Sequence, residues 1–327
     1  MVRGSSLLRA CWPVLVLVWG GFLFADAGAE EADLPQPRPV PQLQVLPEPY
    51  RQFSFQRAGR ELTRYHCGPD LRRPFLYPVH GPSGRSLTRM GSPSDVQGHG
   101  HHSSIWIAHH DVGGVNFWSN SGEGRIVHRS VLRLVDTATS AICETLNDWV
   151  VGGRVLLKER RRMEVEALDG EEWFLTLDLH LEAREEKVIF GKIPFGLVGV
   201  RMAKTIGVDD GGGRIRNSEG GLNEAGVLWK SARWVDYSGP VLRDVIEGIT
   251  LMDHPKNPNH PTFFHVRDDG WMGASLTFKE PRTLRRSVPL HLRYGFYIHA
   301  GSPSVEDLDQ RWKQFAARPL KAFEKER

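Results

Sequence analysis

The sequence predicts an all-β fold of antiparallel strands with one helix near the C-terminus. Short segments that alternate in polarity or are rich in β-branched residues recur along the chain, separated by turn signals such as Asp169-Gly170. A repeat of helical spacing occurs only near the end, at 305–315, where Ser304 can cap a helix. Strands at short intervals, with no helices between them, favour a sandwich or a barrel. The predicted strands include residues 131–135, 154–157, 163–167, 173–181 and 187–193.

Residues 173–181 show the alternation most clearly. Because successive side chains of a strand point to opposite faces, Phe174, Thr176, Asp178 and His180 share one face. Trp173 and the leucines share the other face. We therefore expect one face to belong to the core and the other to face solvent or a second sheet.

The start of the chain has the features of a cleavable signal peptide. Arg3 and Arg9 accompany an almost wholly apolar stretch at 12–24, and Ala27-Gly28-Ala29 has the small-x-small pattern of a cleavage site. The apolar stretch is shorter than the roughly 20 residues that cross a bilayer as a helix, and no later segment approaches that length. We expect residues 1–29 to be a signal peptide and the mature protein to be periplasmic or extracellular, with no membrane contact after cleavage. A retained membrane anchor is the alternative.

The rest of the chain divides by composition into two parts. Residues 30–49 are rich in proline and lack periodicity, which predicts an extended linker. Residues 50–327 contain no further linker, so we expect a single β-sandwich domain there. The oligomeric state stays open.

The charge balance bears on possible partners, and the cysteine content bears on disulfide formation. The formal net charge of +3 falls to +2 without the leader, because Arg3, Arg9 and Asp26 leave with it. This balance gives no support for nucleic-acid binding, and we interpret the basic run at 158–162 as a solvated strand or turn face. Cys67 and Cys143 remain, either as one disulfide or as two buried thiols.

The most unusual segment is 97–118, which concentrates histidine and glycine. Five of the 14 histidines lie between positions 99 and 110. Histidine can exchange a proton near neutral pH, and the neutral ring is a common metal ligand. Gly98 and Gly100 permit unusual backbone angles, and Gly113-Gly114 predicts a tight turn. The segment predicts a histidine-lined pocket with aromatic side chains; hydrogen-bonded loop histidines and core aromatics are the alternatives.

Two other segments carry candidate binding residues. The prolines of 253–268 exclude regular structure before Thr262, which places His254 on a loop and His265 and Arg267 on one face of the following strand. Loop histidines with a purely structural role are the alternative there. Residues 229–239 mix aromatic and charged side chains. No nucleophile elbow, P-loop or HExxH motif occurs, and the glycines at 211–213 indicate a turn.

Several of these segments resemble a bacterial family labelled "PmoA family protein", whose members are mostly domains of unknown function. The matching runs are RPFLYPVHGP (73–82), HGHH (99–102), HHDVGGVNFW (109–118) and GRIVH (124–128). The resemblance continues through 229–239, 254–268 and 292–294, and so covers nearly the whole mature chain. The label implies the membrane subunit of a copper methane monooxygenase, which needs several membrane-spanning helices, so we reject that activity.

Two departures from the family pattern bear on the chemistry. Gly98 and Gly113 stand where the family tends to carry Asp and Asn. The missing carboxylate at Gly98 puts in doubt a metal or acid–base role that depends on it.

A more distant similarity is to the galactose mutarotase-like supersandwich, in which a loop histidine and a carboxylate act on a sugar. Residues 74–81 are similar to its early Phe-Pro-x-x-Gly strand end, and 109–114 to its His-Gly-Gly turn. Phe278-Lys279-Glu280-Pro281 is similar to the later segment that carries the base. This similarity implies an antiparallel β-supersandwich with a short C-terminal helix.

Together these features predict a secreted carbohydrate-processing or carbohydrate-binding protein, whose ligand is a carbohydrate or another small polar molecule. An enzyme of this kind would be an isomerase, a lyase or a hydrolase. The alternatives are a non-catalytic extracellular recognition module and a metal-dependent enzyme. The candidate catalytic residues are His101, His102 and His109, with Asp111 or Glu280 as carboxylate partner. The candidate binding residues are His99, Trp118, Trp229, Arg233, His254, His265 and Arg267.

Three or more imidazoles from His99, His101, His102 and His109 could bind zinc or copper, and their spacing alone decides little. On a strand, His99 and His101 face one way and His102 the other, so the three reach one ion only if the glycines bend the segment. Gly98 also removes a likely carboxylate partner. We therefore expect no stoichiometric metal and no cofactor.

Overall fold

The computed structural model describes residues 39–91, 95, 98–320 and 323. The expected signal peptide and the first part of the expected linker lie outside these residues. The last part of that linker is folded, because β1 (Leu43–Glu48) pairs with β2 (Gln52–Arg57) along its whole length. Leu43 and Val45 alternate into the core, a pattern that the prolines of this segment obscure in the sequence.

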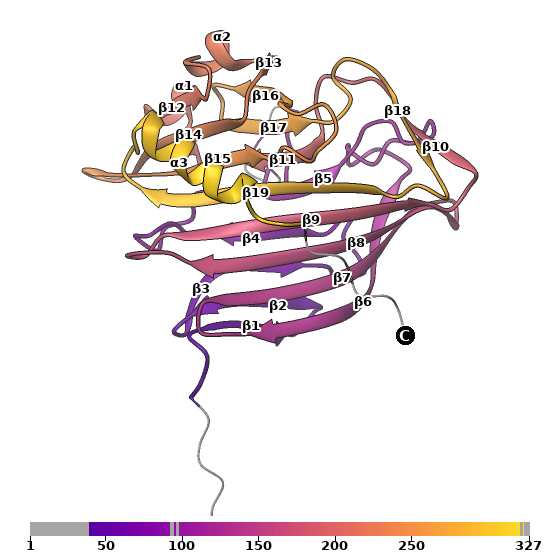
Figure 1. The fold of residues 1–327 in the computed structure, drawn as a ribbon, viewed down its shortest axis with the longest axis horizontal. Helices are drawn as coiled ribbons and strands as arrows, with labels where there is room; N and C mark the ends of the chain where they lie inside the picture. Colours follow the sequence, from indigo (N-terminus) through magenta and orange to yellow (C-terminus); the bar gives the residue numbers. More distant parts are fainter. Residues whose placement is uncertain (1–38, 92–94, 96–97, 321–322, 324–327) are drawn as a thin grey trace, which may run out of the picture. The chain divides into compact units, whose positions relative to one another are not determined.

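Every paired strand in the described part of the chain is antiparallel, and the strands form two large sheets (Figure 1). The first sheet has nine strands in the spatial order β1-β2-β3-β4-β5-β11-β17-β16-β13. Its remaining strands are β3 (Arg60–His66), β4 (Phe75–Val79), β5 (Ile105–Ala108), β11 (Leu197–Arg201), β17 (Trp271–Ser275), β16 (Phe263–Arg267) and β13 (Lys230–Ser231).

The second sheet has eight strands in the order β12-β14-β15-β19-β9-β8-β7-β6. They are β12 (Arg214–Asn217), β14 (Trp234–Leu242), β15 (Val245–Asp253), β19 (Leu290–Ala300), β9 (Trp173–Ala183), β8 (Arg154–Ala167), β7 (Ser140–Val151) and β6 (Arg125–Asp136). A small ribbon of two strands, β10 (Lys187–Phe190) and β18 (Arg282–Arg285), completes the β structure of the described residues.

The hydrophobic core lies between the two large sheets. Trp173 and the leucines of β9 meet residues such as Val198 of β11 and Met272 of β17 there. This arrangement confirms the predicted all-β antiparallel sandwich and the predicted alternation of 173–181. The opposite face of β9 is also covered, since Phe174 packs against Phe315 of α3 (Val305–Ala316).

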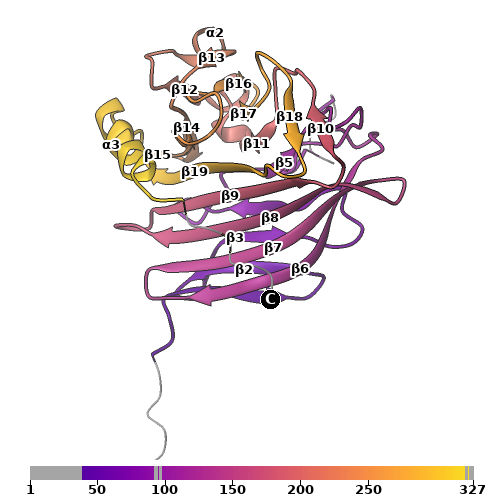
Figure 2. The ribbon, with the colours of Figure 1, turned by 45° about the vertical axis from the view of Figure 1, so that its right-hand side comes forward.

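The helices of the described residues are short. They are η1 (Lys204–Ile206), α1 (Val208–Gly211), α2 (Asn223–Val227) and α3. As predicted, Ser304 caps α3; its hydroxyl accepts a hydrogen bond from the Asp307 amide, and the Asp307 carboxylate accepts one from the Ser304 amide. Figure 2 shows α3 beside β15 and β19. No helix in the described ranges is both long enough and apolar enough to span a membrane.

The basic run at 158–162 lies inside the long strand β8, which joins two of the predicted strands. It is not a solvated face, because Arg161 and Arg162 are both buried. Arg161 is neutralised within the sandwich by Glu159, at 2.6 Å between Nε and Oε1. Glu159 also accepts a hydrogen bond from the indole of Trp149.

A row of alternating charges crosses five neighbouring strands of the eight-stranded sheet. Arg133, Glu144, Arg162, Asp178 and Arg293 are successive cross-strand partners. Arg162 Nε lies 2.6 Å from the Glu144 carboxylate, and Arg293 donates two hydrogen bonds to Asp178, at 2.6 and 2.9 Å. All members of the row except Arg133 are almost fully buried. Adjacent opposite charges compensate the loss of hydration that this burial causes.

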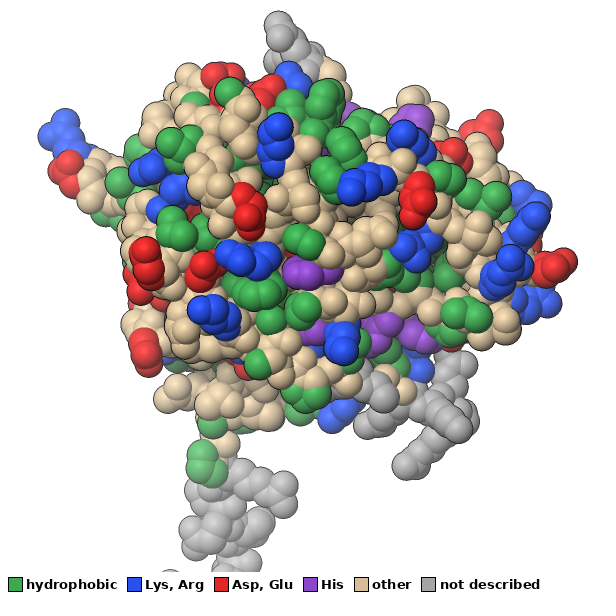
Figure 3. Space-filling view, turned by 45° about the horizontal axis from the view of Figure 1, so that its top comes forward, with side chains coloured by type: hydrophobic (Ala, Val, Ile, Leu, Met, Phe, Trp, Pro, Cys, Tyr) green, Lys and Arg blue, Asp and Glu red, His purple; other side chains and the backbone are tan. Residues whose placement is uncertain are grey.

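Cys67 and Cys143, the two cysteines among the described residues, are separate, buried thiols. Burial raises the pKa of Cys67 to about 12 and raises that of Cys143 as well. On the surface, the face in Figure 3 carries acidic and basic side chains intermixed, with hydrophobic side chains between them. This mixing agrees with the small formal net charge.

Candidate functional site

The nine-stranded sheet carries an unusual row of residues on the face turned away from the eight-stranded sheet. Trp106 of β5, Gly199 of β11, Gly273 of β17 and His265 of β16 are successive cross-strand partners. A Cβ atom at Gly199 would lie 2.4 Å from Cζ2 of Trp106, and one at Gly273 would lie 2.5 Å from the carbonyl oxygen of Val198. Gly199 therefore leaves room for the Trp106 ring to lie across β11, and Gly273 permits the close approach of the β11 backbone.

Aromatic rings fill this space and form one continuous group, which we call the His–Trp cluster. The ring of His102 lies 4.8 Å from that of Trp106 and 5.0 Å from that of Trp271, measured between centroids. The ring of His265 lies 4.0 Å from that of Trp271. The members of the cluster are His99, His101, His102, Trp106, Trp118, His265 and Trp271. It unites five residues that the sequence indicated, namely His99, His101, His102, Trp118 and His265.

Burial makes the imidazoles of the cluster hard to protonate. It lowers the pKa of His265 to about 4, and burial together with the charge of Arg73 lowers that of His101 to about 4. Burial also lowers the pKa of His99 and, more strongly, that of His102. At neutral pH each ring is uncharged and so has one nitrogen that donates and one that accepts a hydrogen bond. Such rings suit the recognition of hydroxyl groups.

Four buried nitrogen atoms of the cluster have no hydrogen-bond partner among the described residues. They are Nδ1 of His99, Nδ1 of His102, Nε1 of Trp106 and Nε1 of Trp271. A buried polar atom left unpaired costs about 1–3 kcal/mol, so native proteins contain few of them. Their concentration on one sheet face marks this face as a candidate binding site.

A carboxylate that the sequence did not single out lies at the edge of the cluster. Asp269, in the turn between β16 and β17, places Oδ2 3.4 Å from Nε2 of His99 and Oδ1 2.9 Å from Nη1 of Arg201. Arg201 is buried and also pairs with Asp95 at 2.9 Å. In the sequence, Asp268-Asp269-Gly270 indicates only a turn. The pairing of β11 with β17, which brings Arg201 beside this turn, is visible only in the fold.

Trp229 stands at the border of the cluster and is 47% exposed. Its ring lies 6.1 Å from that of His265 in an edge-on arrangement. Its backbone has φ of +57°, a conformation that costs a residue with a side chain about 1–2 kcal/mol. A hydrogen bond from its amide to the carbonyl of Phe264, at 2.8 Å, helps to hold it. Arg267, another predicted binding residue, is exposed nearby on β16 and pairs with Glu224.

The structure separates four predicted site residues from the cluster. His109 is fully buried and uses both ring nitrogens, at 2.8 Å from the carbonyl of Asp111 and 2.8 Å from the hydroxyl of Thr277. The Asp111 carboxylate accepts a hydrogen bond from the Gly114 amide and stabilises the glycine turn. His254 packs under α3 against Phe315, and Arg233 pairs with Asp309 of α3. These side chains therefore have structural partners instead of a place in the cluster.

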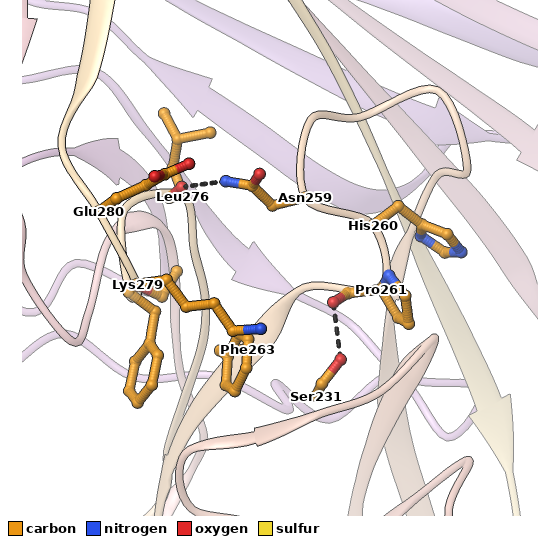
Figure 4. Close-up of a pocket in the computed structure, with 10 residues that line it drawn as sticks. Ser231, Asn259, His260, Pro261, Phe263, Leu276, Lys279 and Glu280 are labelled. Carbon is orange, nitrogen blue, oxygen red and sulfur yellow. Dashed lines mark hydrogen bonds between the residues drawn. The ribbon is translucent and has the colours of Figure 1, made fainter.

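Glu280 lies in a different hollow, a cleft of about 260 Å³ that we call the Lys–Glu cleft (Figure 4). Its floor contains the rings of Phe263 and Phe278, which are stacked with centroids 4.4 Å apart. The side chains that line it include Ser231, Asn259, Phe263, Phe278, Lys279 and Glu280.

Metal binding has no preformed site in the part of the chain that the structure describes. No group of three or more His, Cys, Asp or Glu side chains there is placed to hold an ion. The rings of His99 and His102 are stacked on each other, with centroids 4.7 Å apart.

Three solved structures show a low similarity to the chain. They are a putative kojibiose phosphorylase from the human microbiome (10% identity, TM-score 0.37), a polysaccharide lyase (9%, 0.33) and a 4-alpha-glucanotransferase from Thermococcus litoralis (9%, 0.29). The matches cover 86%, 83% and 80% of this chain, but only 37%, 34% and 39% of those proteins. Similarity at this level carries no argument about function.

Among curated proteins, none matches the sequence of the chain. A family model described as "Family of unknown function (DUF6807)" matches residues 52–313.

Proposed function

We propose that this chain, which belongs to the family of unknown function DUF6807, binds a carbohydrate at the His–Trp cluster. The observation that carries the proposal is the convergence of four uncharged histidines and three tryptophans on one sheet face, beside the exposed ring of Trp229. The aromatic rings supply apolar surface, and the imidazole at the accessible edge, that of His99, supplies hydrogen-bonding nitrogens. A sugar offers the matching combination of apolar ring faces and hydroxyl groups.

The accessible edge of the cluster provides the first contacts for such a ligand. Trp229 offers an exposed ring, and the side chains of His99 and Asp269 are each about one-third exposed. The rings of His102 and Trp106 lie below them and are nearly inaccessible, so they hold the edge in place. A site of this kind is largely formed before the ligand arrives, which reduces the entropy lost on binding.

The binding test uses isothermal titration calorimetry with glucose, galactose, mannose, xylose and their oligosaccharides of two to four units. Trp229→Ala should weaken binding about tenfold or more, because it removes the exposed platform. Tyr50→Ala is the matched control, since Tyr50 is also exposed and also has a positive φ of +61°, but belongs to the remote turn between β1 and β2. The proposal fails if no carbohydrate binds, or if Trp229→Ala binds as well as the unmodified protein.

A specific contact favours proton transfer as a second candidate function. Asp269 lies 3.4 Å from Nε2 of the uncharged His99, so a carboxylate and a neutral imidazole are adjacent at an accessible place. Such a pair can accept a proton and pass it on. Asp269→Asn should then abolish turnover of a bound sugar, which nuclear magnetic resonance of the sugar's anomeric proton measures. The control variant Asp244→Asn, in an exposed turn, should keep the turnover of the unmodified protein. Equal turnover by both variants would exclude this function.

Export is part of the proposal and has its own support. The signal-peptide pattern of residues 1–29 predicts a periplasmic or extracellular protein that begins near Glu30. Export would be contradicted if N-terminal sequencing of protein recovered from a membrane fraction gave Met1 or Val2 as its first residue.

The similarity of 278–281 to the mutarotase segment that carries the base favours a carbohydrate ligand.

A further inference from the structure

The Lys–Glu cleft directly adjoins the border of the His–Trp cluster. Trp229 contacts His265, and two residues later Ser231 pairs with Phe263 across β13 and β16. Phe263 and His265 are alternate residues of β16 and so share a face. Alternate residues of a strand are about 6.6 Å apart. Phe263 of the cleft therefore lies about one sugar unit along β16 from His265, the residue that contacts Trp229.

The side chains of the cleft match the chemistry of a sugar. Figure 4 shows Lys279 extending over Phe263, with Glu280 and Asn259 on the far side of the opening. The ammonium of Lys279 lies 5.0 Å from the centroid of the Phe263 ring, which keeps it within the cleft. The stacked pair of Phe263 and Phe278 provides an apolar floor.

The charges of the cleft favour a neutral ligand. Lys279 and Glu280 are both exposed, and neither forms an ion pair with another described residue. The lining contains one ammonium and one carboxylate, so the cleft has no net formal charge that would favour an anion or a cation. Hydroxyl groups can use both side chains, because they accept from the ammonium and donate to the carboxylate.

We infer that the Lys–Glu cleft is a second sugar subsite, so that the ligand is a neutral oligosaccharide of at least two units. This inference rests on the proposed function, because it takes the platform of Trp229 and His265 as the first subsite. Neighbouring units of one oligosaccharide would occupy the two subsites along β13 and β16. The second unit then binds without a further loss of translational freedom, so affinity rises with chain length.

The test compares affinity for monosaccharides and for their oligosaccharides of two to four units, with the same glucose, galactose, mannose and xylose series. The double variant Lys279→Met/Glu280→Gln removes both charged contacts of the cleft. The matched control is Glu186→Gln/Lys187→Met, which changes two exposed, adjacent residues of opposite charge at the start of β10, outside the residues that line the cleft. Thermal melting of each variant confirms that the fold is intact before titration.

We expect the unmodified protein to bind an oligosaccharide about tenfold more tightly than its monosaccharide. The cleft variant should lose this gain and keep its affinity for the monosaccharide, whereas the control variant should keep both. The inference is overturned if mono- and oligosaccharides bind equally, or if the cleft variant keeps the gain.

The result also separates this inference from the proposed function. If oligosaccharide binding depends on the cleft but is insensitive to Trp229→Ala, the cleft is an independent site and the first subsite is wrong. If monosaccharides bind in a manner that depends on Trp229 and chain length has no effect, only the second subsite is wrong. If no sugar binds, both are wrong.

Discussion

Gly199→Ala adds one methyl group at the point where β11 supports the His–Trp cluster. The new Cβ would lie 2.4 Å from Cζ2 of Trp106 and 2.7 Å from two further atoms of the indole, whereas ordinary contacts begin at 3.4 Å. The ring would have to move by about 1 Å. It has no free space for this movement, because it is fully buried between His102 at 4.8 Å and Trp118 at 5.2 Å.

The expected loss of stability is about 1–2 kcal/mol. Overpacking of a filled interior costs about 1–3 kcal/mol, and replacing glycine within a strand recovers about 0.5–1 kcal/mol of backbone entropy. Urea unfolding measures the difference. Gly68→Ala is the control, since its Cβ would have no neighbour closer than 3.4 Å, and it should change stability by less than about 0.5 kcal/mol.

The same variant should weaken carbohydrate binding, because a displaced Trp106 shifts His102 and the rings that pack on it. Calorimetric titration alongside the unfolding measurement separates the two effects. If Gly199→Ala were as stable as the Gly68→Ala control and bound sugar normally, the indole would not be held against β11, and the account of the cluster as a rigid support would be refuted.

Three further perturbations test other parts of the structure. The free energy of unfolding should be greatest above the unfolded histidine pKa of about 6.5 and should decline as the pH falls toward 4. The reason is that His101 and His265, whose pKa values in the folded protein are about 4, take up protons on unfolding. Equal free energies of unfolding in urea titrations at pH 7 and pH 4.5 would contradict this. Arg161→Met should lower the free energy of unfolding by about 3–5 kcal/mol, because it leaves the buried carboxylate of Glu159 without a cation. Adding Glu159→Gln to this variant should restore part of that loss in the same urea titration. Ser304→Ala removes the cap of α3 and should cost about 1 kcal/mol, detected as faster amide hydrogen exchange at the start of that helix; unchanged exchange would show that tertiary contacts alone hold it.

The features that the sequence predicts well are those set by neighbouring residues. The alternation of 173–181 was enough to identify a strand with Trp173 and the leucines in the core. Ser304 and the following helical repeat were enough to place α3. The strand with His265 and Arg267 on one face was also predicted, because the prolines before Thr262 mark its start.

The site was predicted only in part, because it depends on which strands become neighbours. Trp106, Gly199, Gly273 and His265 form a row only because β5, β11, β17 and β16 pair in that order, and no local pattern encodes that order. His109 looked equivalent to His101 in the sequence. The fold gives it two internal hydrogen bonds, which a search by residue type could not anticipate.

The row of alternating charges across the eight-stranded sheet has a consequence for how that sheet assembles. A shift of β8 by two residues would preserve its hydrophobic face, so the core alone would tolerate such a mistake. In one direction, however, the shift would put Glu164 in the place of Arg162, between Glu144 and Asp178. Three carboxylates would then lie on adjacent strands, and the cations Arg133 and Arg293 would remain only at the two ends of the row, at a cost of several kcal/mol. The charged row thus disfavours this particular register of β8, which hydrophobic packing alone would accept.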